Sequence, residues 1–177
     1  EMTEYAYKHL LYYHDFKAKE LCLGINRADL VGMKRRANEV RILEVKSCRS
    51  DFTSDNKWED YLKYCTHFAF VAPVGVIKLD ELPPEIGLVE LEFYEDTDYR
   101  GETSYTLQHT YKRGCKRLKD KIDDKHYIEL LESIIMRMLL THNMEKNVDY
   151  MEKRISNVEE DIRLILEELS KMRRLTP

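Results

Sequence analysis

The sequence predicts an α/β domain with a mixed β-sheet, followed by C-terminal helices that end in a coiled coil. Three observations support this prediction: a run of strand-like stretches in residues 16–46, a helix between the third and fourth strands, and a heptad repeat near the C-terminus. A strand, a helix and a strand in succession imply a crossover connection. That connection places parallel and antiparallel neighbours in one sheet.

The first part of the chain predicts one helix and a three-stranded meander. The expected elements are a helix at 5–13 and strands at 16–23, 28–33 and 40–46. In the first strand, strict alternation puts Phe16, Ala18 and Glu20 on one face and Leu21 on the other. The turn at 24–26 and a polar loop separate the strands, and these connections are short enough for antiparallel neighbours.

The middle of the chain predicts one further helix and two more strands. Ser54 or Asp55 can cap a helix that runs from about residue 56 to 65. Apolar stretches at 67–72 and 88–93 then read as strands, and residues 94–106 read as irregular. From about residue 116 onward the pattern becomes helical.

A heptad repeat marks the C-terminal segment. The heptad a positions are Val148, Ile155, Ile162 and Leu169, and the d positions are Met144, Met151, Val158, Ile165 and Met172. This spacing predicts a homo-oligomer formed through residues 144–172. An amphipathic helix that folds back onto its own domain is the alternative, and a trimer, tetramer or bundle stays open. The expected divisions are an α/β domain at 1–115, a helical connector at 116–143 and a coiled coil at 144–174.

The composition is that of a soluble globular protein. Charged residues make up 35% of the 177 residues, hydrophobic residues 43%, and the formal net charge is −4. No apolar run approaches the ~18 residues that span a bilayer, so no membrane association is expected. The chain starts with Glu1 and shows no secretory signal. The four cysteines lack zinc-site spacing and read as reduced thiols of a cytoplasmic protein.

Two carboxylates and a lysine form the strongest candidate site. Glu44 and Lys46 are two apart in the third strand, so their side chains share a face, and Asp29 can lie beside Glu44 on the preceding strand. Such oxygens suit Mg²⁺ or Mn²⁺. The lysine can orient or deprotonate a water molecule, or stabilise charge on a phosphate. These are the parts needed to hydrolyse a phosphodiester, although a solvated strand face can carry the same pattern without any function.

Longer motifs around this trio resemble a known family. They are Arg27-Ala28-Asp29-Leu30, Glu44-Val45-Lys46-Ser47, Asp51-Phe52-x-x-Asp55-x-Lys57-Trp58-x-x-Tyr61 and Cys65-x-x-Phe68-x-Phe70-Val71-x-Pro73. Residues 14–90 thereby resemble the MmcB-like DNA repair proteins of the PD-(D/E)XK nuclease superfamily. The resemblance implies a restriction-endonuclease-like αβββαβ core. Thr66-His67 departs from the family, which tends to carry an Asp after the Cys.

The resemblance also implies roles for individual residues. Asp29 and Glu44 would bind the metal, with Val45 included in the metal site, and Lys46 would be the catalytic lysine. The superfamily often adds a glutamate from the first helix. Glu4 would be that residue, and Glu20 on the first strand is the competitor.

Further residues are candidates for accessory roles. Lys57 and Tyr61 share a helical face, and Lys57 can reach a phosphate. Asp51 and Asp55 can support the site or shape turns, Trp58 reads as a core residue, and His14 is a candidate phosphate contact. The basic run at 112–121 is either a solvated face or a grip on the nucleic-acid backbone, through Lys112, Arg113, Lys116, Arg117 and Lys119.

These observations predict a Mg²⁺- or Mn²⁺-dependent nuclease that cleaves DNA in a repair, defence or mobile-element context. A catalytically inactive DNA-binding or assembly module on the same fold is the alternative, and a scaffold that acts through its coiled coil is a third reading.

Overall fold

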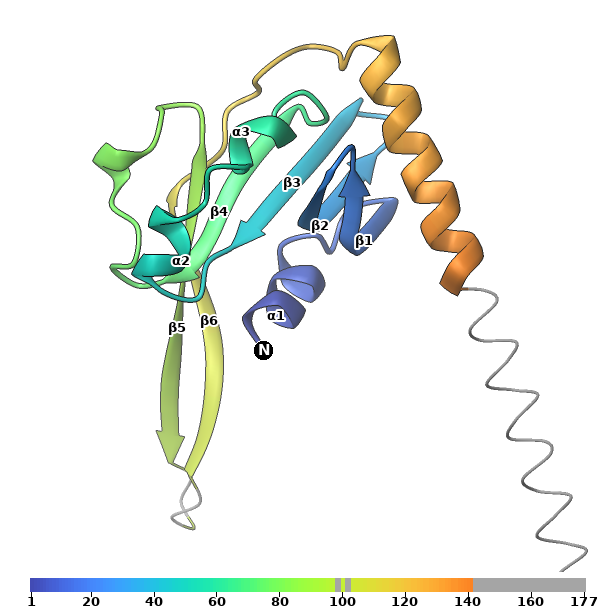
Figure 1. Ribbon diagram of the computed structural model, residues 1–177. Coiled ribbons are helices and arrows are strands. Elements are labelled where there is room, and N and C mark those ends of the chain that lie inside the picture. Colours follow the sequence, from blue (N-terminus) through green and yellow to red (C-terminus); the bar gives the residue numbers. More distant parts are fainter. Residues whose placement is uncertain (98–99, 101–102, 142–177) are drawn as a thin grey trace, which may run out of the picture. The chain divides into compact units, whose positions relative to one another are not determined.

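The computed structural model describes residues 1–97, 100 and 103–141 (Figure 1). The elements are α1 (Met2–His9), β1 (Phe16–Leu23), β2 (Asn26–Lys34), β3 (Glu39–Val45), α2 (Arg49–Thr53), α3 (Trp58–Tyr61), β4 (His67–Pro73), a 3₁₀ turn η1 (Leu79–Glu81), β5 (Gly87–Thr97) and β6 (Thr103–Arg113). A further helix begins at residue 124 and continues to 141, where the description ends.

The strands form one mixed sheet in the order β1-β2-β3-β4-β5-β6. The first three strands are antiparallel neighbours, β3, β4 and β5 run parallel to one another, and β5 and β6 form an antiparallel hairpin. The predicted α/β class, the meander and the mixed sheet are therefore confirmed. The carboxyl ends of β3 and β4 lie together, and β3 leads directly into the candidate site.

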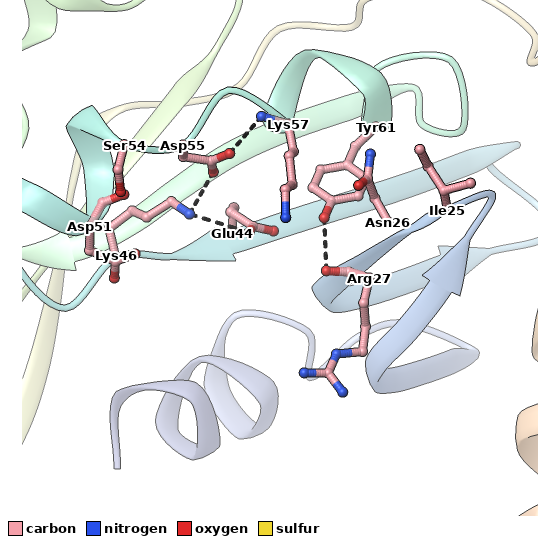
Figure 2. Close-up of a pocket in the computed structure, with 10 residues that line it drawn as sticks. All are labelled: Ile25, Asn26, Arg27, Glu44, Lys46, Asp51, Ser54, Asp55, Lys57 and Tyr61. Atoms are coloured by element: carbon pink, nitrogen blue, oxygen red, sulfur yellow. Dashed lines mark hydrogen bonds and ion pairs between the residues drawn. The ribbon is translucent and has the colours of Figure 1, made fainter.

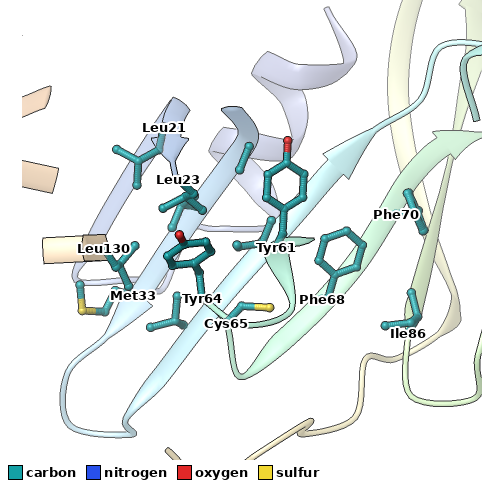
Figure 3. Close-up of a cluster of buried hydrophobic side chains, with 14 of the residues drawn as sticks. Leu21, Leu23, Met33, Tyr61, Tyr64, Cys65, Phe68, Phe70, Ile86 and Leu130 are labelled. Carbon is teal, nitrogen blue, oxygen red and sulfur yellow. The ribbon is translucent and has the colours of Figure 1, made fainter. Parts of the chain in front are cut away.

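Apolar side chains pack on both faces of the sheet. One cluster joins the sheet to α3 and to the start of the helix from residue 124, and it includes Tyr61, Phe68, Phe70 and Leu130 (Figure 3). A second, smaller cluster joins the opposite face to α1 through Ala6, Leu10 and Leu11. Trp58 lies against Phe68 and Phe70, which agrees with its predicted core role. The sheet is thus covered on both sides where the central strands run.

The expected alternation in β1 is wrong at one point. The β1–β2 register passes from the Lys19–Leu30 pair to the Leu21–Ala28 pair without pairing Glu20, whose φ is +53°. This left-handed residue rotates the strand, so Leu21 joins Ala18 in the same buried cluster. The irregularity lies at the level of Asp29 on the neighbouring strand.

Three helical predictions need correction. The first helix ends at His9, because residues 10–13 continue as turns. The helix expected at 56–65 is shortened to α3, and a second short helix, α2, precedes it. The Asp55 side chain accepts a hydrogen bond from the Lys57 backbone amide at 2.8 Å and so shapes the turn between them. The C-terminal helical region begins at residue 124 rather than 116.

Strand β6 was also missed. Residues 94–106 were expected to be irregular, yet β5 continues to Thr97 and β6 begins at Thr103. Most β6 side chains are exposed, so the segment carries few of the buried residues that identify a strand.

The C-terminal predictions fall mostly outside the described residues. The heptad segment 144–172 lies there, as does the coiled-coil division 144–174. Contacts group residues 1–134 into one compact unit. Across the described part of the chain, no helix has the length and apolar character needed to cross a membrane. The four cysteines are free, as expected.

Candidate active site

The meander brings the two predicted carboxylates together. Asp29 lies on β2 and Glu44 on β3, and these two strands are antiparallel neighbours in the sheet. The Val45 backbone amide donates a hydrogen bond to Oδ2 of Asp29 at 2.8 Å, and the Asp29 amide donates to Oε2 of Glu44 at 3.4 Å. Each strand thereby fixes the carboxylate of the other.

Lys46 follows β3 directly and turns its side chain toward Glu44. Its backbone amide bonds the Val71 carbonyl at 2.9 Å, which extends the β3–β4 ladder by one residue. Its Nζ lies 3.3 Å from Oε1 of Glu44 and 2.6 Å from Oδ2 of Asp55 (Figure 2). The side chains are 6%, 8% and 8% exposed for Lys46, Glu44 and Asp55, so this is a buried charge cluster.

Burial sets the protonation of the two carboxylates. Burial, together with the neighbouring charge of Asp29, raises the pKa of Glu44 to about 7 against the opposing effect of Lys46. Burial also raises the pKa of Asp29, although the Val45 hydrogen bond opposes this. Burial alone would lower the pKa of Lys46, but its contacts with Asp55 and Glu44 outweigh burial and raise it.

A pocket of about 430 Å³ opens over this cluster. Its lining residues are Ile25, Asn26, Arg27, Glu44, Lys46, Asp51, Ser54, Asp55, Lys57 and Tyr61 (Figure 2). Lys57 and Tyr61 both reach it, as their helical spacing predicted. The Lys57 side chain extends into the pocket toward Glu44, and the Tyr61 hydroxyl donates a hydrogen bond to the Arg27 carbonyl at 2.8 Å.

Asp51 has a structural contact in addition to lining the pocket. Its Oδ2 accepts hydrogen bonds from the Ser47 backbone amide at 2.8 Å and from the Ser47 hydroxyl at 3.1 Å. This closes the turn that immediately follows Lys46. The residue therefore supports the position of the lysine and forms part of the pocket wall.

Three of the predicted accessory residues lie away from the pocket lining, and Asp29 and Val45 are not among the lining residues either. Glu4 on α1 pairs with Lys19 at 2.6 Å, and Glu20 pairs with Arg27 at 3.8 Å. His14 is 2% exposed and lies 3.3 Å from Glu39. In the described part of the chain, Glu4 of α1 therefore does not join the charge cluster of Glu44, Lys46 and Asp55. The His14 side chain is too buried to contact a phosphate.

Most of the basic run is engaged with other parts of the chain. The Arg113 guanidinium donates hydrogen bonds to four carbonyls of the β4–β5 connection, and Arg117 donates to the Asn38 carbonyl. Lys112 pairs with Glu90 at 3.3 Å, and Lys119 donates to the Lys63 carbonyl. These contacts are structural, and the run does not line the pocket.

Several pocket residues were not singled out as site residues from the sequence. Ile25, Asn26 and Arg27 come from the β1–β2 hairpin, and Ser54 follows α2. The closeness of α3 to this hairpin depends on tertiary packing. The sequence gives one signal for the three hairpin residues. They lie in or next to the short turn that leads into the strand carrying Asp29.

The donor chemistry fits a hard divalent cation. Asp29 and Glu44 supply buried carboxylate oxygens whose ionisation is opposed by burial and by each other, and a cation would relieve that cost. Within the described residues, no group of three His, Cys, Asp or Glu side chains is placed to hold a metal. A cation would therefore also need main-chain, water or phosphate oxygens, and the Val45 carbonyl is the predicted main-chain donor.

Comparison with known proteins gives two matches. The model of the family described as DNA repair protein MmcB-like matches residues 5–123. Among solved structures, the SPO1766 protein of unknown function from Silicibacter pomeroyi has a TM-score of 0.61 and 18% sequence identity, and the match covers 82% of this chain and 88% of that one. The second likeness concerns the fold alone. None of the curated proteins matches.

Proposed function

Because the chain belongs to the family of MmcB-like DNA repair proteins, we propose that it is a metal-dependent nuclease that hydrolyses DNA phosphodiester bonds. The proposal includes a restriction-endonuclease-like core, to which the order α1-β1-β2-β3 followed by helices and β4 is suited. The observation that carries it is the buried contact of Lys46 with Glu44, beside Asp29, at the floor of an open pocket.

The charge on Lys46 favours two of its three predicted roles. Its ammonium group is held by two carboxylates, which keep it protonated. A protonated lysine stabilises negative charge on phosphate oxygens and cannot take a proton from water. We therefore assign Lys46 to charge stabilisation and orientation of the attacking water.

The remaining residues hold and align the substrate. Asp29 and Glu44, with the Val45 carbonyl, would bind Mg²⁺ or Mn²⁺, which supplies polarisation of the phosphate and a more acidic water molecule. Lys57 reaches into the same pocket and pairs with a phosphate oxygen. Arg27 lies at the other side of the opening and is 63% exposed, so it is available to a neighbouring phosphate.

A cleavage assay tests the proposal. Wild-type protein is incubated with plasmid and with single-stranded, duplex, flapped and mismatched oligonucleotides in Mg²⁺ or Mn²⁺, beside Lys46→Ala and Glu44→Ala. We expect cleavage by wild type and a loss of about 100-fold or more in both variants, as is typical when a transition-state charge contact is removed. Lys125→Ala and Glu85→Ala alter exposed residues outside the pocket and serve as matched controls.

Two outcomes would reject the proposal. DNA binding without cleavage by wild type on every substrate would assign the chain to the inactive DNA-binding module. Equal cleavage by wild type and both site variants would mean that the activity comes from another site or from a contaminant.

A further inference from the structure

Ile25 is an apolar side chain presented to solvent at the rim of the candidate active site. It is 100% exposed, yet it lines the same pocket as Glu44 and Lys46. Figure 2 shows it beyond Tyr61, at the end of the pocket away from Lys46. An exposed isoleucine elsewhere would need no explanation, but this one borders a charged pocket.

The turn that carries Ile25 is short and firmly held. Leu23 pairs with Asn26, so Gly24 and Ile25 alone form the turn. Gly24 has a φ of +59°, as the first residue of a type II′ turn requires. A Cβ atom there would lie 3.0 Å from the Tyr64 hydroxyl oxygen, so the turn packs closely against the segment after α3.

Two hydrogen bonds fix the base of this turn to α3. The side-chain amide of Asn26 donates to Oδ2 of Asp60 at 2.9 Å, and the Tyr61 hydroxyl donates to the Arg27 carbonyl at 2.8 Å. Tyr64 is itself held by its hydrogen bond to Glu129 at 2.6 Å. The isoleucine is therefore presented by a rigid support, which lowers the entropic cost of inserting it into a ligand.

Cationic groups lie beside Ile25 in the same pocket. Arg27 is two residues away on the hairpin, and Lys57 immediately precedes α3. Both side chains are exposed. Their charges suit the phosphates of a nucleic-acid strand, whereas an aliphatic side chain beside them suits the faces of its bases.

We infer that Ile25 is a wedge that enters the base stack of duplex DNA next to the phosphate bound at Glu44 and Lys46. Isoleucine is among the side chains that proteins insert between base steps, at the cost of unstacking them. This inference rests on the proposed function, and it names a residue that selects the substrate.

The wedge implies a substrate class. Unstacking costs least where a base is mismatched or unpaired, so a wedge favours such positions over intact duplex. The preferred substrate is therefore duplex DNA with locally weakened pairing near the cleaved phosphate. Single-stranded DNA needs no wedge, because its bases are already free to separate.

The first test measures unstacking without cleavage. Full-length Lys46→Ala protein is mixed, without metal, with mismatched duplex that carries 2-aminopurine beside the mismatch. Fluorescence should rise severalfold on binding, because insertion unstacks the probe. Adding Ile25→Ser should abolish the rise, and Ile25→Leu should restore it. Val74→Ser, which alters an exposed apolar residue in a turn outside the pocket, should leave it unchanged.

The second test measures cleavage with the active protein. Wild type should cut mismatched duplex roughly tenfold faster than paired duplex, because a mismatch lowers the cost of unstacking the bases. Ile25→Ser should lose this preference, so its rates on mismatched and paired duplex should become nearly equal. Equal melting temperatures would show that the variant is folded.

The outcomes separate the wedge from the nuclease. Cleavage by wild type with no effect of Ile25→Ser on preference or fluorescence would overturn the wedge and leave the proposed function standing. An Ile25-dependent fluorescence rise without any cleavage would support the wedge and reject hydrolysis. A failure of Lys46→Ala to bind any of the duplexes would overturn the wedge.

Discussion

Nζ of Lys46 lies 2.6 Å from Oδ2 of Asp55 and 3.3 Å from Oε1 of Glu44, so its nearer carboxylate belongs to the segment between α2 and α3. The sequence predicts that the side chains of Glu44 and Lys46 share a face, and in the structure these two side chains are in contact. Asp55 adds a second contact that holds the ammonium group against the Glu44 side of the pocket. The position of the lysine thus depends on two different elements.

Asp55→Asn should slow cleavage more than it weakens DNA binding. The amide keeps the shape but removes the charge that positions Lys46, so kcat should fall about tenfold while KM changes little. Loss of a hydrogen bond between charged groups should also lower the free energy of unfolding by about 2 kcal/mol. Steady-state kinetics and urea denaturation measure the two effects. Asp80→Asn, an exposed change in η1, is the control, and an unchanged kcat in Asp55→Asn would refute the positioning role.

Metal binding should stabilise the protein without any DNA present. Saturating Mn²⁺ should raise the melting temperature by several degrees, because a ligand that binds only the folded state stabilises it. EDTA should reverse the shift. Asp29→Asn and Glu44→Gln should show little or no shift, since each removes a carboxylate ligand. A shift of wild-type size in both variants would place the cation elsewhere.

Ionisation of Glu44 should destabilise the metal-free protein as the pH rises from about 4.5 to about 7. The unfolded carboxyl ionises near 4.5, whereas the folded one stays protonated until about 7, so its contribution is full below 4.5 and is lost over this window. Glu44→Gln cannot ionise. The unfolding free energy of Glu44→Gln, relative to that of wild type, should therefore increase by on the order of 2–3 kcal/mol as the pH rises across the window. Chemical denaturation in EDTA at several pH values measures this gain. Glu85→Gln, an exposed change, should give a flat difference, and a flat difference for Glu44→Gln would contradict the assignment.

Glu20→Gly should stabilise the protein. Glu20 has a φ of +53°, which costs a non-glycine residue roughly 1–2 kcal/mol. Its exposed ion pair with Arg27 at 3.8 Å contributes little. After the greater flexibility of unfolded glycine is subtracted, a gain of about 0.5–1 kcal/mol is expected from urea denaturation. Asn38→Gly, where φ is +46° and asparagine tolerates the conformation, should gain less. A larger gain at Asn38 would argue against strain at Glu20.

The heptad repeat predicts that the full chain associates. Wild type should sediment as an oligomer at micromolar concentration, and a charge at heptad a positions, as in Ile155→Lys with Ile162→Lys, should yield monomers. Ser156→Lys, at the b position of the same heptads, should leave the oligomer intact. A monomeric wild type would contradict association through the heptad repeat.

The sequence predicted the centre of the site because strand periodicity acts over two residues. Glu44 and Lys46 share a face for that reason, and β2 precedes β3 closely enough to bring Asp29 alongside. Ile25 and Asp55 were harder to interpret, because their positions depend on how the short helices pack on the sheet. Leu21 was placed on the wrong face, since no pattern announces the left-handed backbone at Glu20. Strand β6 was missed because it buries few side chains.

All residues that line the pocket fall between Ile25 and Tyr61, an unbroken stretch of the chain. The hairpin of β5 and β6, the helix from residue 124 and helix α1 contribute none of them. The pocket is therefore built by one continuous segment of the chain. Evolution can lengthen, trim or replace the peripheral elements to suit new partners while the chemistry is inherited as one piece, and a transplant of this segment onto a related sheet would carry the whole set of groups with it.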